Sequence, residues 1–318
     1  MNRLRLSLLL LASLTAACGG TPEELESESG LATREDAVTI PARGTATTLD
    51  FGNWNLEWFG STSNGPTNES LQLSNARDVI NGADLDIWGL EEVVSVTSFN
   101  SLVSQLPGYA GLLASASTVT GGSTYYSSSE QKVGIVYKTS IASVVSARVI
   151  LTAYDSDFAG RPPLEVKLRV SLNGRTEDIV VIVLHAKAFN DSTSWQRRSN
   201  ASVALKSYLD STYPTTKVMV FGDWNDDVDT SITSGKASPY KNFVDDSLDY
   251  TFPTKALTDA HIATTASYPD AIDHQLVTNE LQASYVSGSV QAYRVDSYIS
   301  NYSNSTSDHF PVLSRYTW

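Results

Sequence analysis

Short apolar runs alternate along the chain with segments whose apolar residues recur at helical spacing. The short runs predict strands and the helical spacing predicts helices. Helices are expected at 71–81, 98–106 and 194–209, and strands at 47–56, 85–90, 109–116, 133–137, 143–151, 164–172, 178–185, 217–222, 273–278, 283–286, 291–295 and 309–315. Asn173-Gly174, between two strand runs, is a strong hairpin signal. The pattern predicts an α+β fold of packed sheets with helices outside.

The N-terminal segment departs from this pattern. Arg3 and Arg5 precede an apolar stretch too short to span a bilayer of ~30 Å, so residues 1–17 are interpreted as a signal peptide. The run Leu-Thr-Ala-Ala before Cys18 resembles a bacterial lipobox, but Thr replaces the usual Leu, so simple secretion stays open. Residues 18–46 are expected to be a disordered tether, and 47–318 one folded domain. We therefore expect an exported protein, lipid-anchored to the cell envelope or secreted.

Composition narrows the class of protein. A chain of 318 residues, 41% of them apolar, is long enough to bury a full core. Cys18 is its single cysteine, so the domain after it has no disulfide and no thiolate nucleophile. The formal net charge is −13, or −15 once Arg3 and Arg5 leave with the signal peptide. This charge argues against a broad basic surface for nucleic acid, although divalent cations can neutralise an acidic pocket.

Short polar motifs stand at or near the ends of several apolar runs. A buried core has no use for carboxylates and imidazoles at strand ends, but a hydrolytic metal site does. Oxygen ligands hold hard cations such as Mg²⁺ or Ca²⁺, and a His–Asp pair can move a proton. The motifs are Asn53-Trp54-Asn55, Leu90-Glu91-Glu92, His185-Ala186-Lys187, Gly222-Asp223-Trp224-Asn225, Ile272-Asp273-His274 and Ser307-Asp308-His309.

In this order, the six motifs resemble the endonuclease/exonuclease/phosphatase superfamily over about 51–316. That superfamily includes pancreatic-type DNases, abasic-site endonucleases, neutral sphingomyelinases and inositol polyphosphate 5-phosphatases. The resemblance implies a four-layer α/β sandwich of two packed mixed β-sheets flanked by helices. It also implies that 47–318 is a catalytic domain whose active site lies at one edge of the sheets, where strand ends converge.

The resemblance implies a metal site around Glu92. Asn55 and Asp308 would lie beside it, and the expected ion is Mg²⁺, with Mn²⁺ or Ca²⁺ as alternatives. Glu91 stands where the family often has Gln. Because adjacent strand residues face opposite sides, only one of the two glutamates can lie in the pocket, and the motif favours Glu92. A strand-end Asn55 that merely caps a turn is the alternative.

The resemblance also assigns the residues that act on the phosphate and the water. Asp223 would orient or deprotonate the attacking water, and Asn225 would contact the phosphate. His185 would hydrogen-bond the phosphate. Asp273 would orient His309, because a carboxylate on one imidazole nitrogen fixes the tautomer and stabilises the charged ring.

Further phosphate contacts are expected from cations and an amide. Arg161, in Gly-Arg-Pro-Pro, resembles an arginine that reaches phosphate in DNase-like members, although a surface arginine in a proline turn is the alternative. Asn55 and Lys187 are the other expected contacts. Three nearby carboxylates are expected to be solvated or to hold a second cation, namely Asp226, Asp227 and Asp229. The other histidines are expected to be structural or at the surface, namely His261 and His274.

We therefore expect an exported metal-dependent phosphodiesterase, a DNase-like endonuclease that hydrolyses nucleic acid, with DNA favoured, by in-line attack of water. Arg161, the loop pair Tyr125-Tyr126 and the helix pair Arg197-Arg198 support this substrate, because local cations and stacking aromatics contact nucleic acid.

Two other functions stay open, and a third, a phosphatase acting on inositol phosphates, is weaker because no basic cluster for multiple phosphates is evident. A sphingomyelinase-type lipid phosphodiesterase would suit a membrane anchor, although no exposed aromatic hairpin for entering a bilayer is evident. A non-catalytic surface binding module is opposed by chemically competent residues at every motif. No protein partner is inferred.

Overall fold

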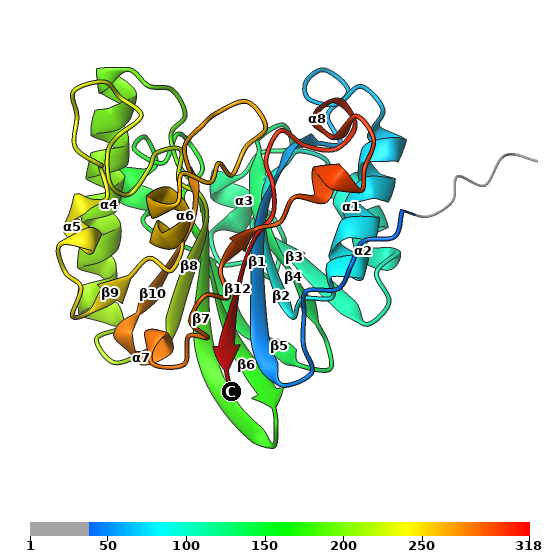
Figure 1. The fold of residues 1–318 in the computed structure, drawn as a ribbon, viewed down its shortest axis with the longest axis horizontal. Coiled ribbons are helices and arrows are strands. Elements are labelled where there is room, and N and C mark those ends of the chain that lie inside the picture. The colour runs from blue at the N-terminus through cyan, green and yellow to red at the C-terminus, as the bar shows by residue number, and fades with distance from the viewer. Residues whose placement is uncertain (1–37) are drawn as a thin grey trace, which may run out of the picture. The chain divides into compact units, whose positions relative to one another are not determined.

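Two six-stranded β-sheets form the centre of the computed structural model, which describes residues 38–318 (Figure 1). The first sheet has the order β11 (Gln291–Ala292), β12 (Val312–Thr317), β1 (Thr48–Phe59), β2 (Ile87–Val93), β4 (Lys132–Lys138) and β3 (Tyr109–Leu113). The second has the order β5 (Ala142–Val149), β6 (Leu164–Leu172), β7 (Arg175–His185), β8 (Val218–Asp223), β10 (Asp273–Thr278) and β9 (Tyr250–Thr251). The pairs β1–β2 and β7–β8 run parallel and the other pairs antiparallel, so both sheets are mixed.

Helices cover the outer faces of both sheets. In Figure 1, α1 (Glu69–Ala83) and α2 (Val96–Ser104) lie on the right, and α4 (Ser192–Thr212) and α5 (Lys241–Val244) on the left. The side chain of Asn68 accepts from Leu71 N at the start of α1, and that of Asp191 accepts from Thr193 N at the start of α4. Such caps satisfy backbone N–H groups that the first helical turn leaves free. The remaining short helices are α3 (Gly122–Tyr125), α6 (Lys255–Asp259), α7 (Asn279–Gln282) and α8 (Tyr302–Ser305).

Three apolar clusters separate four layers. One joins α1 and α2 to the first sheet through Trp54 and Ile80. The second lies between the sheets, where Phe51 of β1 packs with Phe221 of β8 at 6.2 Å between ring centroids. The third joins α4 to the second sheet through Leu205. The predicted four-layer sandwich is therefore confirmed.

The folded chain begins before residue 47, where the tether was expected to end. Ile40 is buried, and Tyr293 Oη donates to Pro41 O at 2.6 Å. The N–H groups of Arg43 and Gly44 both donate to Ala83 O at 2.9 Å. The buried Ile40 side chain and these hydrogen bonds therefore order the segment, although its apolar residues follow no helical or strand spacing. The predicted signal peptide at 1–17, Cys18 and the rest of the tether as far as residue 37 lie outside the described residues.

One predicted strand was wrong, and another, 291–295, is a strand only at Gln291–Ala292, since a 3₁₀ helix begins at Val295. Residues 283–286 follow α7 as a turn, and Tyr285 makes a single bridge to Tyr316. Ala283 N donates to Asn279 O at 3.0 Å, so its backbone group serves a helical turn instead of a ladder. The short helix α3 lies between 116 and 133, where the sequence predicted no element.

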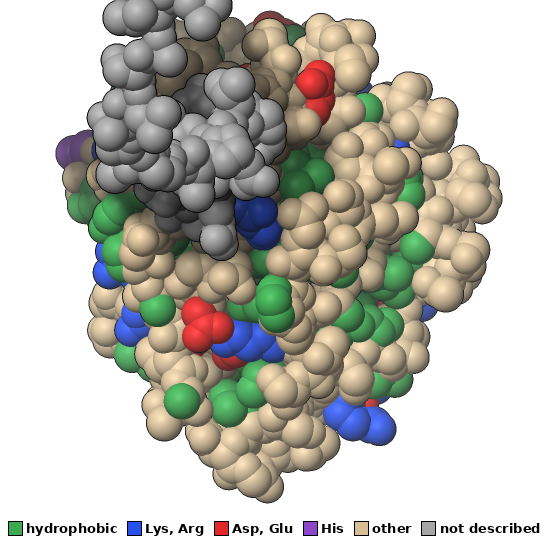
Figure 2. All heavy atoms as spheres, turned by 90° about the vertical axis from the view of Figure 1, so that its right-hand side faces the viewer, with side chains coloured by type: hydrophobic (Ala, Val, Ile, Leu, Met, Phe, Trp, Pro, Cys, Tyr) green, Lys and Arg blue, Asp and Glu red, His purple; other side chains and the backbone are tan. Residues whose placement is uncertain are grey.

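The face turned to the viewer in Figure 2 is the side of Figure 1 that carries α1 and α2. Lys and Arg side chains of the described residues are scattered singly over the visible part of it. Within residues 38–318, no helix is both long and apolar enough to cross a membrane.

Candidate active site

Three strands of the second sheet bring three polar residues into one row. His185 pairs with Asp223 in the parallel β7–β8 register, and Asp273 pairs with Asp223 in the antiparallel β8–β10 register. Gly222 precedes Asp223 with φ at 146°, and a Cβ there would lie 2.0 Å from Leu184 O. Only glycine therefore allows this close approach of β7 and β8.

The first sheet contributes Asn55 and Glu92 to the same place. Asn55 Nδ2 donates to Glu92 Oε1 at 3.1 Å and to Asp223 Oδ2 at 3.0 Å, so one amide ties the two sheets together. Asn55 Oδ1 accepts from Glu57 N at 2.9 Å. This arrangement uses the Asn55 amide to position carboxylates, and its predicted contacts with metal and phosphate stay predictions.

Glu92 lines the cavity, whereas Glu91 lies behind it. Glu92 Oε2 accepts from Trp58 N at 3.0 Å. Glu91 is completely buried and neither of its carboxyl oxygens has a hydrogen-bond partner. Burial, followed by the charges of Asp273 and Asp223, raises the pKa of Glu91 well above its usual value, so this side chain is a neutral acid.

His309 reaches the row from the loop before β12. Its Nδ1 lies 2.9 Å from Asp273 Oδ2, and its Nε2 lies 3.9 Å from Asp223 Oδ2. Ser307 Oγ donates to Asn55 O at 2.6 Å and accepts from His309 N at 3.0 Å, which anchors the loop to β1. Burial opposes a charge on His309, but the Asp273 and Asp223 carboxylates outweigh burial and raise its pKa well above the usual value. His309 is therefore a cation held by Asp273.

His185 has the opposite character. Its Nε2 lies 3.6 Å from Glu92 Oε1 and 3.5 Å from Asp223 Oδ2. Burial, reinforced by the charge of Arg161, lowers the pKa of His185 well below its usual value. The ring is therefore neutral, which is the form that can bind a metal ion.

Two groups of side chains have the spacing of a metal site, and they share Asp223. In each group three ligand atoms lie within 4.8 Å of one another, namely Glu92, His185 and Asp223 in one, and Asp223, Asp273 and His309 in the other. That spacing suits a cation with ligands at ~2–2.6 Å.

The surrounding carboxylates also fit a cation. Burial raises the pKa of Asp223 to about 7, and burial together with Asp308 and Glu92 raises that of Glu57 to about 7. Glu57 Oε2 is buried without a hydrogen-bond partner. A divalent cation relieves such repulsion between buried carboxylates. Asp308 lies at the edge, 44% exposed, with Oδ1 3.8 Å from His309 Nε2.

Asn225 and three cations lie above the acidic residues. Asn225 adopts φ of 54°, a left-handed conformation that asparagine tolerates. Its N–H donates to Asp223 Oδ1 at 2.9 Å and its Nδ2 donates to Ala186 O at 3.2 Å. Arg161 Nη2 donates to the same carbonyl at 3.2 Å. Arg161, Lys187 and Arg197 all line the cavity, so cations and carboxylates share it.

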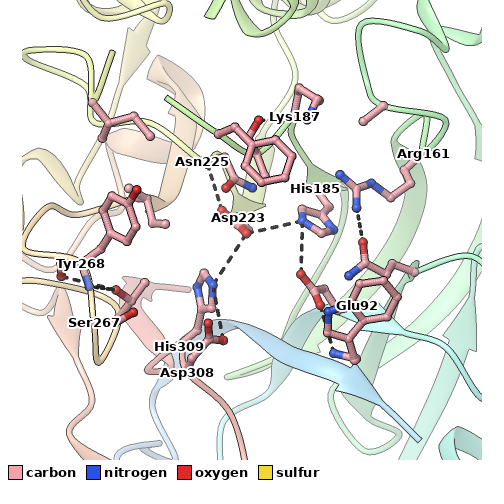
Figure 3. Close-up of a pocket in the computed structure, with 18 of the residues that line it drawn as sticks. Glu92, Arg161, His185, Lys187, Asp223, Asn225, Ser267, Tyr268, Asp308 and His309 are labelled. Carbon is pink, nitrogen blue, oxygen red and sulfur yellow. Dashed lines mark hydrogen bonds and ion pairs between the residues drawn. The ribbon is translucent and has the colours of Figure 1, made fainter. Parts of the chain in front are cut away.

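The site is a cavity of about 640 Å³. Figure 3 shows Asp223 between His185 and His309, with Arg161 and Tyr268 on opposite sides of this group. Predicted residues that line the cavity are Glu92, Arg161, His185, Lys187, Asp223, Asn225, Asp308 and His309. Asn55 and Asp273 contact these residues from beneath.

Sequence reasoning missed Glu57, Gln131, Phe189 and Tyr268. Glu57 follows Asn55 by two residues, but its φ is 48° and the β1–β2 register shifts after Asn55, so strand alternation does not mark it. The side chain of Gln131 accepts a hydrogen bond from Arg161 Nη1. Gln131, Phe189 and Tyr268 are in loops, where no period marks them.

Several residues expected to meet nucleic acid are structural instead. Tyr126 is buried and donates to Pro162 O at 2.8 Å, so the Tyr125-Tyr126 pair is not a free stacking platform. Arg198 is fully buried against Asp226 at 2.8 Å, unlike its neighbour Arg197.

Two of the three carboxylates expected to be solvated or cation-binding are also structural. Asp226 pairs with Arg198, and buried Asp227 accepts from Thr258 Oγ1 at 2.6 Å. His274 is buried with Nδ1 3.1 Å from Thr254 Oγ1, and His261 is exposed, which confirms the expectation for both histidines.

The fold and the site together define a metal-dependent phosphoesterase. The chain belongs to the Endonuclease/Exonuclease/phosphatase family, whose sequence model matches residues 52–309. No curated protein matches the chain significantly.

Solved structures share the fold at low sequence identity. D. rerio TDP2 complexed with single-strand DNA product has a TM-score of 0.57 and 12% identity, over 85% of this chain and 99% of TDP2. The human Nocturnin catalytic domain with bound sulfate has a TM-score of 0.57 and 18% identity, over 87% and 99%. The Bacteroides thetaiotaomicron mannosyl-6-phosphatase has a TM-score of 0.53 and 14% identity, over 85% and 100%. These likenesses show the common fold and leave the substrate open.

Proposed function

We propose that this chain is an exported metal-dependent phosphodiesterase that cleaves nucleic acid as a DNase-like endonuclease, with DNA favoured and Mg²⁺ as the expected ion. One observation carries the proposal. A single cavity is lined both by the carboxylates and imidazoles around Asp223 and by the cations Arg161, Lys187 and Arg197. A phosphodiester chain fits this arrangement, because several cations can contact successive phosphates while one phosphate reacts.

The chain's own residues divide the work in this mechanism. Asp223 positions the attacking water and accepts its proton, since a carboxylate within hydrogen-bond reach of a water can act as a general base. His309, kept charged and oriented by Asp273, hydrogen-bonds the phosphate. Asn225 and Arg161 hold the non-reacting phosphate oxygens. These contacts stabilise the charge that develops in the transition state.

The metal would be held by Glu92, His185 and Asp223, with Asp308 and Glu57 nearby. His185 thereby moves from the phosphate contact expected from the sequence to the metal, and Asn55 is left outside the ligand set. This group is favoured over Asp223, Asp273 and His309 because His309 already contacts Asp273 at 2.9 Å and is assigned to the phosphate, whereas His185 Nδ1 and Nε2 make no hydrogen bond to another side chain of residues 38–318. A bound divalent cation supplies charge neutralisation at the phosphate. Mn²⁺ and Ca²⁺ fit the same oxygen-rich site.

Plasmid nicking tests this function directly. The wild-type protein should nick supercoiled plasmid with Mg²⁺ or Mn²⁺ and lose the activity in EDTA. His309→Ala and Asp223→Ala should each lose ~10²-fold or more of the rate, because the first removes a hydrogen bond to the reacting phosphate and the second removes the general base. His261→Ala, at an exposed position outside the cavity, is the matched control and should retain the rate.

Other outcomes point to the alternatives. Release of phosphocholine from sphingomyelin without plasmid nicking would replace the proposal with a lipid phosphodiesterase. Silence in both assays with intact metal binding would favour a non-catalytic binding module. Wild-type nicking rates in His309→Ala or Asp223→Ala would disprove the assigned roles.

A further inference from the structure

Phe189 is an exposed aromatic residue at the edge of the cavity. Its side chain and backbone together are 69% exposed, and it follows the His185 motif in the loop between β7 and α4. It lines the same cavity as His185 and Asp223. Its φ is 80°, a left-handed conformation that is uncommon for a bulky residue. An exposed ring in an unfavourable backbone conformation beside reactive groups needs a physical cause.

The cause of this conformation is a buried arginine. Arg198 Nη1 donates to Lys187 O at 2.7 Å and to Phe189 O at 2.8 Å. Arg198 is itself fully buried and pairs with Asp226 at 2.8 Å. The buried Arg198 guanidinium thus fixes the loop backbone through the carbonyls on both sides of Ala188. This fixation presents the Phe189 ring at the cavity before any substrate arrives, which lowers the entropy cost of binding.

Lys187 makes the neighbourhood of the ring cationic. Its Nζ lies 4.1 Å from the centroid of the Phe189 ring and donates to Ala188 O at 3.1 Å. Burial, followed by the charges of Arg197 and Arg161, lowers the pKa of Lys187, which is consistent with a crowd of cations around the ring. An aromatic face beside several cations suits a planar group attached to phosphates.

Choline fits this place poorly. A quaternary ammonium group does bind aromatic faces. Here, however, the Lys187 ammonium already occupies that role, and Arg161 and Arg197 line the same cavity. A second cation would be repelled, whereas an anionic nucleotide would be attracted.

We propose that Phe189, with Lys187 beside it, is a subsite that stacks one nucleobase next to the scissile phosphate, while Lys187 contacts the neighbouring phosphate. Base stacking on aromatic side chains is worth ~5- to 150-fold in affinity per base and tolerates every base. The subsite rests on the proposed nuclease function and adds that the enzyme distinguishes base-bearing from base-free backbones.

Two matched single-stranded DNA oligonucleotides test the subsite. Both carry phosphorothioate linkages at every position except one central phosphodiester. One has thymine on each side of that linkage, and the other has abasic spacers there. With Mg²⁺ or Mn²⁺, wild type should cleave the base-bearing oligonucleotide with a kcat/KM ~10-fold or more higher than the abasic one.

Variants assign the preference to the ring. Phe189→Ala and Phe189→Leu should reduce the preference to within ~2-fold by slowing only the base-bearing substrate, and Phe189→Trp should keep it. Leu248→Ala, at an 84% exposed hydrophobic position outside the cavity, is the matched control and should keep it as well. An undiminished preference in Phe189→Ala, or equal cleavage of both oligonucleotides by wild type, would overturn the subsite.

A binding readout separates this proposal from the nuclease function. Fluorescence anisotropy of the same labelled oligonucleotides should show ~10-fold weaker binding to Phe189→Ala for the base-bearing one and no change for the abasic one. If wild type cleaves neither oligonucleotide but keeps this binding difference, the nuclease proposal fails and the stacking subsite stands. If it cleaves both equally and binds both equally, the nuclease proposal stands and the subsite fails.

Discussion

At the residue scale, the histidines of this chain differ sharply in protonation although three of the four are buried. At His309 the Asp273 and Asp223 carboxylates outweigh burial and raise the pKa. At His185 burial, followed by the charge of Arg161, lowers the pKa although Glu92 and Asp223 lie 3.6 and 3.5 Å away. His274 lies between Thr254 and the ring of Phe252, with no carboxylate among its hydrogen-bond partners. The same side chain thus takes different charges because its neighbours differ.

His274 gives the protein a measurable sensitivity to acid. Burial lowers the pKa of His274 from 6.5 to about 4. Because the folded value is lower, the unfolded chain binds the proton first, so stability is lost as pH falls from 6.5 towards 4. At pH ~4.5, protonation of His274 in the unfolded chain lowers the free energy of unfolding by about 2–3 kcal/mol relative to pH ~7. Urea unfolding at pH ~7 and ~4.5 measures this loss. Between the two pH values, the free energy of unfolding of wild type should fall by about 2–3 kcal/mol more than that of His274→Asn. The asparagine keeps a polar atom near Thr254 and does not titrate. Equal losses would contradict the prediction.

The sequence identified residues whose chemistry is rare at strand ends, and it missed those defined by shape. Asp223 and Glu92 stand out because a carboxylate after an apolar run is unusual. Phe189 and Tyr268 do not, because an aromatic residue in a loop looks the same whether it is buried or exposed. The error at Tyr126 is of this kind, since only packing decides that the ring is buried.

At the element scale, α4 connects the two loops that follow β7 and β8. Arg198 on α4 donates to Lys187 O and Phe189 O in one loop, and to Asp226 and Thr233 in the other. The helix therefore sets the relative position of the two loops. One loop follows His185 at the end of β7, and the other contains Asn225 after β8.

Removing the Arg198 charge should lower the free energy of unfolding. Arg198→Met leaves buried Asp226 without its cation, which costs about 3–5 kcal/mol. Arg197→Met, one position away on the same helix, loses hydrogen bonds to Ser156 O and should cost about 1 kcal/mol. Urea unfolding of both variants measures the difference. Similar costs for the two would show that the buried pair has no special weight.

Periodicity predicted elements well where an apolar run and a turn signal coincide. The hairpin at Asn173-Gly174 joins β6 to β7 as expected. The strand prediction at 283–286 was wrong because a period of two over four residues does not distinguish a strand from a turn that follows a helix. Residues 38–46 were expected to be disordered, but the structure orders them. Their contacts are one buried isoleucine and a few backbone hydrogen bonds, which composition does not reveal.

At the scale of the whole molecule, each sheet carries half of the site. Asn55 and Glu92 belong to the first sheet, and His185 and Asp223 to the second. The distance between the sheets therefore sets the distance between the two halves. Gly89 of β2 faces Phe221 of β8 so closely that a Cβ would lie 2.1 Å from the Phe221 ring.

Gly89→Ala should push the sheets apart. Overpacking of this kind costs about 1–3 kcal/mol. It should also lower the plasmid-nicking rate, because Glu92 moves away from Asp223. In a Phe221→Leu background the alanine has more room, so its cost should fall. A double-mutant cycle by urea unfolding measures this coupling, and purely additive costs would contradict close packing as the cause.

The order of strands has a consequence for biosynthesis. The chain builds β1 to β4 in the first sheet, then β5 to β10 in the second, and returns to the first sheet with β11 and β12. His309 arrives with this final return, and its carbonyl accepts from Trp54 Nε1 at 3.0 Å. A nascent chain on the ribosome can thus complete the second sheet and still lack the imidazole that Asp273 orients.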